Sequence, residues 1–103
     1  MLTCRGATFG GRVAASLLGA IGLPELVTGN LADYEAAALR LAKDATSLRA
    51  LRRKLEQNRG THPLFDTDRY RRHLEAAYTT MWDNHQNGAP RSFAVKPIDG
   101  PER

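Results

Sequence analysis

The chain opens with residues 2–13, which read as the end of a β-strand, a glycine-rich turn and the first turn of a helix. A strand this short cannot pair with itself, and parallel strands find partners only through long crossover connections. A strand in this position therefore needs more partner strands than the rest of the chain contains. We predict that the chain is the C-terminal piece of a larger α/β domain, most of whose sheet lies upstream.

Composition predicts a folded piece of one domain or less. Of the 103 residues, 42% are apolar and 25% are charged, which matches globular proteins and differs from disordered or collagen-like chains. Cys4 is the single cysteine, so an internal disulfide and a cysteine-based zinc cage are excluded, and a reducing compartment is favoured. No apolar run approaches the ~18 residues of a membrane span, and no secretion signal is visible. We expect a cytoplasmic protein with no membrane partner.

Helical periodicity begins at about Arg12 and stops before Gly22 and Pro24, which predicts the first helix. Its apolar positions recur every three or four residues at Val13, Ala14, Leu17, Leu18 and Ile21. Leu26 and Val27 then form a short apolar run, which is either a small strand or an extended link. The link is the favoured interpretation.

Two further helices follow. The second starts after Asn30, a good cap, and ends near Lys43. Its stripe consists of Leu31, Tyr34, Ala38 and Leu41. The third starts near Thr46 or Ser47, both acceptable caps, and runs to Gly60. Its stripe consists of Leu48, Leu51 and Leu55.

The last helix begins at Asp66 or Thr67 and carries the most apolar face of the chain. That face consists of Tyr70, Leu74, Ala77, Tyr78, Met81 and Trp82. Its spacing favours a core-facing stripe over a ligand-stacking box, and we expect part of it to be exposed in this chain and to promote self-association. The prolines beyond residue 87 predict an extended or disordered tail. The predicted fold is thus mainly α, with about four helices, one or two strand stubs, a folded segment at 1–87 and a tail at 88–103.

Several short runs occur in the order seen in a known family. They are Leu2-Thr3, Gly6-Ala7-Thr8-Phe9, Arg12-Val13-Ala14-Ala15-Ser16-Leu17, Gly22-Leu23-Pro24-Glu25-Leu26, Asp33-Tyr34-Glu35, and Pro63-Leu64-Phe65-Asp66-Thr67 with Tyr70. Over most of its length the chain therefore resembles the C-terminal part of the catalytic region of O-linked N-acetylglucosamine transferases and SPINDLY-like protein glycosyltransferases. It departs from that family at Arg5-Gly6-Ala7-Thr8, where members usually have Pro-Gly-Glu-Thr, so a proline and a carboxylate are replaced.

This resemblance implies the end of the second lobe of a Rossmann-like, B-type glycosyltransferase. Such an enzyme transfers N-acetylglucosamine from UDP-N-acetylglucosamine to a serine or threonine hydroxyl of a protein acceptor, without an obligatory metal or other cofactor. The groups that hold the UDP diphosphate lie mostly upstream of the point where this chain begins. The resemblance therefore implies that the chain works with the upstream remainder of the transferase and is inactive alone.

Gly6, Thr8 and Arg12 are the candidate donor-binding residues, at the edge of that site. Backbone N–H groups at a helix start, together with the helix dipole, attract anions such as a diphosphate. Two other interpretations stay open: the glycine turn is architecture only, and Arg12 pairs with a neighbouring carboxylate. We assign no catalytic residue and no metal ligand.

A cluster of basic residues accounts for the formal charge of +4 and supports a second hypothesis, a free-standing basic helical module that binds protein or nucleic acid. Its members are Arg49, Arg52, Arg53, Lys54, Arg59, Arg69, Arg71 and Arg72. Glu56 and Glu75 interrupt the cluster, so a solvated helix face is favoured over a nucleic-acid interface. His62, His73 and His85 lack zinc-site spacing and have no activated nucleophile near them in the sequence, which favours cap or surface roles.

Overall fold

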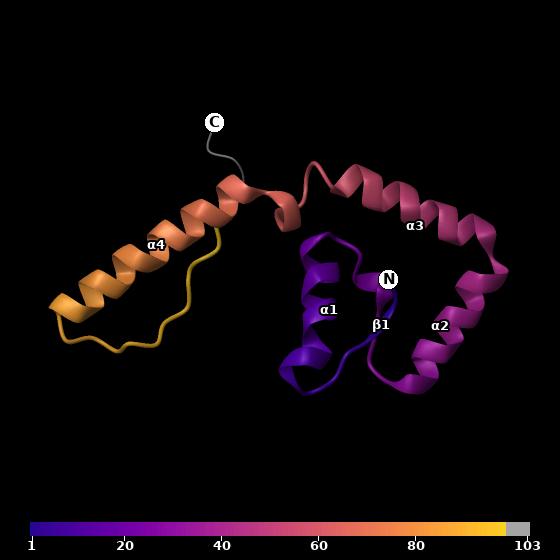
Figure 1. Cartoon of the computed structure of the whole chain (residues 1–103), viewed down its shortest axis with the longest axis horizontal. Coiled ribbons are helices and arrows are strands. Elements are labelled where there is room, and N and C mark those ends of the chain that lie inside the picture. The colour runs from indigo at the N-terminus through magenta and orange to yellow at the C-terminus, as the bar shows by residue number, and fades with distance from the viewer. Residues whose placement is uncertain (99–103) are drawn as a thin grey trace. The chain divides into compact units, whose positions relative to one another are not determined.

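The structure is a computed structural model that describes residues 1–98. The chain divides into two compact units, Met1–Phe65 and Asp66–Arg103, the second described as far as residue 98. The elements, labelled in Figure 1, are β1 (Thr3–Cys4), α1 (Phe9–Ala20), the 3-10 turn η1 (Pro24–Leu26), β2 (Val27–Thr28), α2 (Leu31–Lys43), α3 (Ala45–Asn58), the 3-10 turn η2 (Pro63–Phe65) and α4 (Thr67–Gln86). The prediction of a mainly helical chain with four helices and short strands is confirmed for the described residues.

The two strands pair in parallel, with Thr3 opposite Val27 and Cys4 opposite Thr28. Because α1 connects them, β1, α1 and β2 form one βαβ unit. Both α1 and α2 contact the strands, which lie between these helices in Figure 1. The favoured interpretation of Val27 as an extended link is wrong. The partner that makes β2 a strand lies at the start of the chain, where a local pattern cannot reveal it.

Each helix has a side-chain cap at its start, provided by Thr8, Asn30, Asp44 and Asp66 in turn. The first helix starts at Phe9, earlier than the predicted Arg12, because Thr8 Oγ1 accepts a hydrogen bond from the Gly11 amide at 3.3 Å. Capping by Asn30 and the end of α2 at Lys43 are as predicted. The capping residue of α4 is Asp66, one of the two predicted, and it accepts from the Arg69 amide at 2.9 Å.

The start of α3 differs from the prediction of Thr46 or Ser47 as its cap. Asp44 Oδ1 accepts hydrogen bonds from the Thr46 amide at 3.0 Å and the Ser47 amide at 3.1 Å. A carboxylate satisfies two helix-start amides at once and is favoured by the positive end of the helix dipole. The helix also ends at Asn58, two residues before the predicted Gly60.

The core of the first unit is formed by Leu18, Ile21, Leu23 and Leu26, each at most 8% exposed. Half-buried side chains pack around it from the residue before β1 and from β2, α2, α3 and η2: Leu2, Val27, Leu41, Leu51 and Leu64. This core holds α1 against the strands and positions the turn that precedes it.

Only part of each predicted stripe reaches this core: Leu18 and Ile21 of the first helix, Leu41 of the second and Leu51 of the third. The stripe predicted for the second helix is wrong at Leu31, which is 76% exposed, and the buried residue of α2 is Ala37, which the prediction left out.

One buried polar side chain joins the ends of α1 and α3. Asn58 Nδ2 donates to the carbonyl oxygens of Ile21 at 2.8 Å and Gly22 at 3.3 Å. Gly22 has a φ of +74°, and a β-carbon there would overlap the His62 ring and lie 2.8 Å from Asn58 Nδ2. Gly22 is therefore required both for its left-handed backbone and for the space it leaves.

The second unit consists of α4 and the segment that follows it. Within the described residues α4 has no buried residue, and its predicted apolar stripe is exposed apart from the half-buried Ala77, from 37% at Leu74 to 66% at Tyr70. Among the charged side chains of α4, Arg71 forms ion pairs with Asp68 at 2.8 Å and with Glu75 at 2.7 Å. These pairs stabilise an exposed helix modestly.

Residues 88–98 form neither helix nor strand. They turn back at Gly88, whose φ is +62°, and return along α4, as Figure 1 shows. Two hydrogen bonds hold this return: the Asn84 side chain to the Pro90 carbonyl oxygen at 3.0 Å, and the Ile98 amide to His73 Nε2 at 3.1 Å. The division into 1–87 and a tail at 88–103 stays a prediction, and residues 99–103 lie outside the described residues.

None of the helices in residues 1–98 combines the length and the apolarity needed to span a bilayer.

Candidate functional site

The candidate site is the turn between β1 and α1. The Arg5 amide continues the strand pairing by donating to the Thr28 carbonyl oxygen at 2.8 Å. The next amide, that of Gly6, donates to the Gly11 carbonyl oxygen at 2.9 Å, so the turn folds back onto the first turn of the helix. A β-carbon at Gly11 would lie 3.0 Å from Gly6 Cα, which explains the glycine at position 11, whereas a β-carbon at Gly6 would make an ordinary contact at 3.5 Å. The turn is a defined structure that positions the start of α1.

Its hydrogen bonding determines which groups can meet a ligand. The Gly6 amide is already used by Gly11, and the Gly11 amide is capped by Thr8 Oγ1. The first-turn amides of Phe9 and Gly10 have no acceptor inside the helix, because helix starts leave such donors unpaired. A β-carbon at Gly10 would have no atom within 4 Å, so this side of the helix start is open.

The electrostatics of the turn favour an anion. The first turn of α1 has no acidic residue to neutralise the positive end of the helix dipole. Arg12 is exposed, and no carboxylate within residues 1–98 forms an ion pair with it. The interpretation that Arg12 pairs with a neighbouring carboxylate is therefore wrong for the described residues. Thr8 keeps a hydroxyl proton to donate, because its oxygen only accepts in the cap.

The structure thus brings Gly6, Thr8 and Arg12 to the same end of α1 but gives them different roles. Among residues 1–98, Thr8 presents a free donor and Arg12 a positive charge without an ion pair, whereas Gly6 shapes the turn. Sequence reasoning missed Gly11, whose lack of a side chain permits the close approach of the turn. The signal was present in the pair Gly10-Gly11 at the start of a helical pattern.

The three histidines have structural contacts. The His62 ring lies against Gly22, and its Nδ1 is 3.0 Å from Thr61 Oγ1. His73 Nε2 accepts from the Ile98 amide, and the His85 ring centroid lies 6.1 Å from that of Trp82. In the part of the chain that the structure describes, no three His, Cys, Asp or Glu side chains are placed to hold a metal ion.

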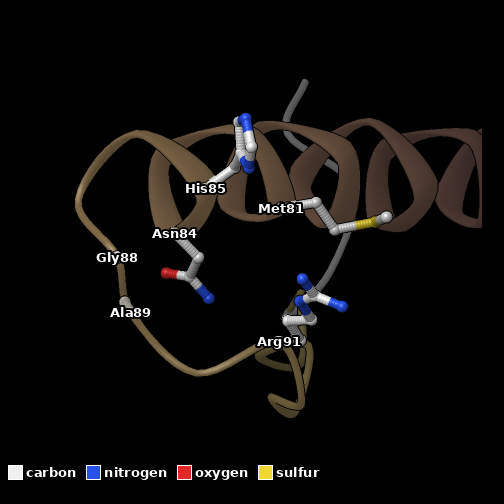
Figure 2. A pocket seen from close by; sticks show the side chains of 6 residues that line it. All are labelled: Met81, Asn84, His85, Gly88, Ala89 and Arg91. Atoms are coloured by element: carbon white, nitrogen blue, oxygen red, sulfur yellow. The ribbon is translucent and has the colours of Figure 1, made fainter.

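A hollow of about 460 Å³ lies at the C-terminal end of α4. Its lining residues are Met81, Asn84, His85, Gly88, Ala89 and Arg91, and Figure 2 shows the Asn84 side chain inside the loop and His85 on the far side of the helix. Asn84 is committed to the Pro90 carbonyl oxygen. The ionisable side chains in the lining are Arg91 and His85, and no sequence pattern pointed to this hollow.

These observations define the class of the molecule: a helix-rich segment built on one βαβ unit, with an anion-compatible turn between its first strand and helix. The sequence profile of Glycosyl transferase family 41 matches residues 1–74, which include the whole turn and the first three helices. The chain belongs to that family.

Individual relatives agree with this assignment. A probable UDP-N-acetylglucosamine–peptide N-acetylglucosaminyltransferase, SEC, of Arabidopsis thaliana is 41% identical over 90 residues, which cover 85% of this chain and 9% of the relative. The probable enzyme of the same kind named SPINDLY in Solanum lycopersicum is 36% identical over 87 residues, covering 84% and 9%. The UDP-N-acetylglucosamine–peptide N-acetylglucosaminyltransferase of Caenorhabditis elegans is 36% identical over 90 residues, covering 87% and 8%. The chain thus spans about a tenth of the length of these relatives.

Proposed function

We propose that this chain is the C-terminal segment of the catalytic region of a cytoplasmic, B-type protein O-glycosyltransferase. The enzyme transfers N-acetylglucosamine from UDP-N-acetylglucosamine to a serine or threonine hydroxyl of a protein acceptor. The observation that carries this proposal is the family match across residues 1–74, together with relatives whose names state that activity. The alternative of a free-standing basic module is less favoured, because the match includes the basic helix α3 as well as the turn.

Within this enzyme the opening turn serves the edge of the donor site. The Thr8 hydroxyl, the open amides of Phe9 and Gly10, and the unpaired Arg12 guanidinium all suit a diphosphate. When the bond between the sugar C1 and the diphosphate oxygen breaks, negative charge grows on the departing UDP. Fixed donors and a positive charge near that position stabilise the transition state.

The chain by itself is inactive in this proposal. Sugar transfer also needs the groups that hold most of the nucleotide and a group that accepts the proton of the acceptor hydroxyl. The histidines of the described residues are engaged in contacts with Gly22, Ile98 and Trp82. The remainder of the catalytic region supplies those functions.

The first test is a titration of the chain with UDP, in which binding is monitored through the amide NMR shifts of residues 5–13. We expect weak binding with shifts at Phe9, Gly10 and Arg12, which Arg12→Ala reduces and the control Arg59→Ala leaves unchanged. Shifts elsewhere, or equal binding by Arg12→Ala, would contradict the donor-edge role. Transfer of labelled sugar by the chain alone would contradict its inactivity.

The second test concerns the enzyme as a whole. The segment of the Arabidopsis thaliana relative that aligns with this chain is replaced by this chain, and sugar transfer to protein is measured. Retained activity is the expected result, with a loss of about tenfold or more on adding Arg12→Ala. A folded chimera with full UDP binding and no transfer would contradict the proposed function.

A further inference from the structure

Asn87 and Gly88 form the exposed turn that follows α4 in the second unit. Asn87 caps the C-terminal end of the helix with φ −96° and ψ 6°, and Gly88 has a φ of +62°. Figure 2 shows Gly88 in the loop that leaves the helix. The pair lies beyond residue 74, where the match to the family profile ends. The peptide bond between the two residues therefore belongs neither to the helix nor to the candidate site.

The Gly88 amide has no hydrogen-bond acceptor within residues 1–98 and no side chain beside it. The Asn87 amide before it donates to the Asp83 carbonyl oxygen at 3.0 Å. The Ala89 amide after it donates to the Asn84 carbonyl oxygen at 2.9 Å. A β-carbon at Gly88 would meet no atom within 4 Å, so the space around this nitrogen is open. The Gly88 nitrogen is therefore free to approach the Asn87 side chain.

The other three asparagines of the chain do not combine these features. Asn58 is buried, and its side chain donates to the Ile21 carbonyl oxygen at 2.8 Å. Asn84 lies inside α4, and Asn30 caps α2. Each of the three is followed by a residue with a side chain, in order Leu31, Arg59 and His85 for Asn30, Asn58 and Asn84. Asn87 alone precedes a glycine at an exposed turn.

We propose that Asn87 is a site of spontaneous deamidation, a covalent modification that the folded chain permits at this position. The Gly88 nitrogen attacks the Asn87 side-chain carbon Cγ, so that a new N–Cγ bond forms and the Cγ–Nδ2 bond breaks. Ammonia leaves with the proton of the Gly88 amide, and a succinimide ring remains. Water then opens the ring at either of its carbonyl carbons and yields aspartate or isoaspartate. Water is the sole co-reactant, and the inference does not rest on the proposed role of the opening turn.

The present geometry of the pair is held by weak contacts. The attack requires rotation of the Asn87 side chain and of the peptide group that follows it. This rotation opens the hydrogen bond from Asn87 Nδ2 to the Asp83 carbonyl oxygen, at 2.9 Å, and the bond from the Ala89 amide. Water readily replaces hydrogen bonds at an exposed helix end, so they delay the reaction without preventing it. Glycine adds the backbone freedom that the rotation needs.

Deamidation weakens the end of α4. The product carboxylate only accepts hydrogen bonds, so the bond that Asn87 Nδ2 donates to the Asp83 carbonyl oxygen is lost. The new negative charge lies at the negative end of the helix dipole and four residues after Asp83, which carries a like charge. Isoaspartate in addition lengthens the backbone. The last helical turn and the loop that the Ala89 amide closes are therefore expected to open.

The test incubates the purified full chain at mildly alkaline pH and maps its peptides by mass spectrometry at successive times. Chromatography separates the aspartate and isoaspartate forms. Asn30, Asn58 and Asn84 in the same chain serve as internal controls. We expect Asn87 to convert at least about tenfold faster than any of them, with both isomers present. Conversion of Asn87 at the rate of these three would overturn the inference.

The same measurement on the chain unfolded in urea separates the effect of the fold from that of the local sequence. Asn87 in the folded chain should convert within about tenfold of its rate in the unfolded chain, because its turn is exposed and opens locally. Folding should suppress conversion of the buried Asn58 far more strongly. Protection of Asn87 as strong as that of Asn58 would show that the fold holds the pair fixed, against the inference.

Gly88→Ala and Asn87→Gln test the chemistry. Alanine places a β-carbon next to the attacking nitrogen, and glutamine can form only a larger, less favourable ring. Both variants should therefore reduce conversion at position 87 about tenfold or more. Gln86→Ala, at an exposed neighbouring position, is the matched control and should leave the rate unchanged. Undiminished conversion in the first two variants would contradict the ring mechanism.

Asn87→Asp reproduces the aspartate product and tests the structural consequence. The amides at positions 87 and 89 should exchange with solvent about threefold or more faster in Asn87→Asp than in Asn87→Gln, which keeps a neutral donor. Amide hydrogen exchange followed by NMR measures this. Equal exchange in the two variants would show that the modification leaves the end of α4 intact, contrary to the expected opening.

Discussion

Asn58 donates a hydrogen bond from its side-chain nitrogen to the carbonyl oxygen of Ile21 at a distance of 2.8 Å, and so joins the end of α3 to the end of α1. Ile21 is 3% exposed, and Asn58 itself is 9% exposed. A buried carbonyl group that loses its donor has no water to replace it. The contact therefore couples α3 to α1, the helix that carries the candidate site.

We predict that Asn58→Ala lowers the free energy of unfolding by about 1–3 kcal/mol, because the carbonyl oxygens of Ile21 and Gly22 lose their donor in a buried place. Urea unfolding followed by circular dichroism measures this. The control is Gln57→Ala, an exposed neighbour on the same helix, with an expected change within about 0.5 kcal/mol. Equal effects of the two variants would contradict a special role for Asn58.

Gly22→Ala and Gly19→Ala should have opposite effects on stability. Gly22 has φ +74° and the His62 ring in the place of its β-carbon, so alanine costs about 1–2 kcal/mol from the backbone alone, and more from the clash. Gly19 lies within α1 with nothing near its β-carbon position, so alanine is expected to stabilise by about 0.5–1 kcal/mol. Thermal unfolding compares them. Adding His62→Ala to Gly22→Ala should recover the part that is due to the clash.

The turn before α1 can be tested with a matched glycine pair. Alanine at Gly11 would place its β-carbon 3.0 Å from Gly6 Cα and 3.3 Å from the Gly6 nitrogen, so we expect the Gly6–Gly11 hydrogen bond to break. Alanine at Gly10 meets no atom within 4 Å and should leave the turn intact. Amide hydrogen exchange of Gly6 should become faster in Gly11→Ala only. Unchanged exchange there would show that the turn does not depend on the close approach.

Asp44 predicts a pH dependence of stability. The hydrogen bond from the Ser47 side chain, followed by those from the Ser47 and Thr46 amides, lowers the pKa of Asp44 below its usual value. The folded pKa is thus below the unfolded one, near 3.9, so the stabilisation is fully present above about pH 5 and is lost as the pH falls through the folded pKa. We expect the urea midpoint of the native chain to exceed that of Asp44→Asn at pH 7, with the difference shrinking toward pH 3. A difference that does not change with pH would contradict this.

The ion pair between Glu25 and Lys54 should contribute little. Its atoms are 2.7 Å apart, but the two side chains are 39% and 44% exposed, so water and salt screen the attraction. Burial acts to raise the pKa of Glu25, but the hydrogen bond from Lys54, a backbone hydrogen bond and the positive charge of Lys54 together outweigh it, so the pKa is lowered. Lys54→Met is expected to change the free energy of unfolding by less than about 1 kcal/mol, and the change should fall further in high salt. A loss as large as that of Asn58→Ala would contradict this.

Much of the local structure follows from short-range signals. Asn30 and Asp66 are helix caps because their oxygen atoms accept hydrogen bonds from amides three residues ahead. A short sequence pattern includes both the cap and the amide, so it can predict such a cap. The family assignment is of the same kind, because runs such as Arg12-Val13-Ala14-Ala15-Ser16-Leu17 lie within one element. Asp44 was missed because three good caps occur within four residues, and only the backbone course decides which carboxylate or hydroxyl faces the free amides.

The sequence by itself determined the helices, two of their four caps and the family, since these depend on residues a few positions apart. Only the tertiary structure decided that Val27–Thr28 is a strand, that the Gly6 amide is used inside the turn, and that Asn58 is buried against the end of α1. Each of these depends on where another segment of the chain lies in space. Strand pairing and burial depend on contacts between residues that are far apart in the sequence. A short stretch of sequence does not contain both partners of such a contact, so it cannot predict it.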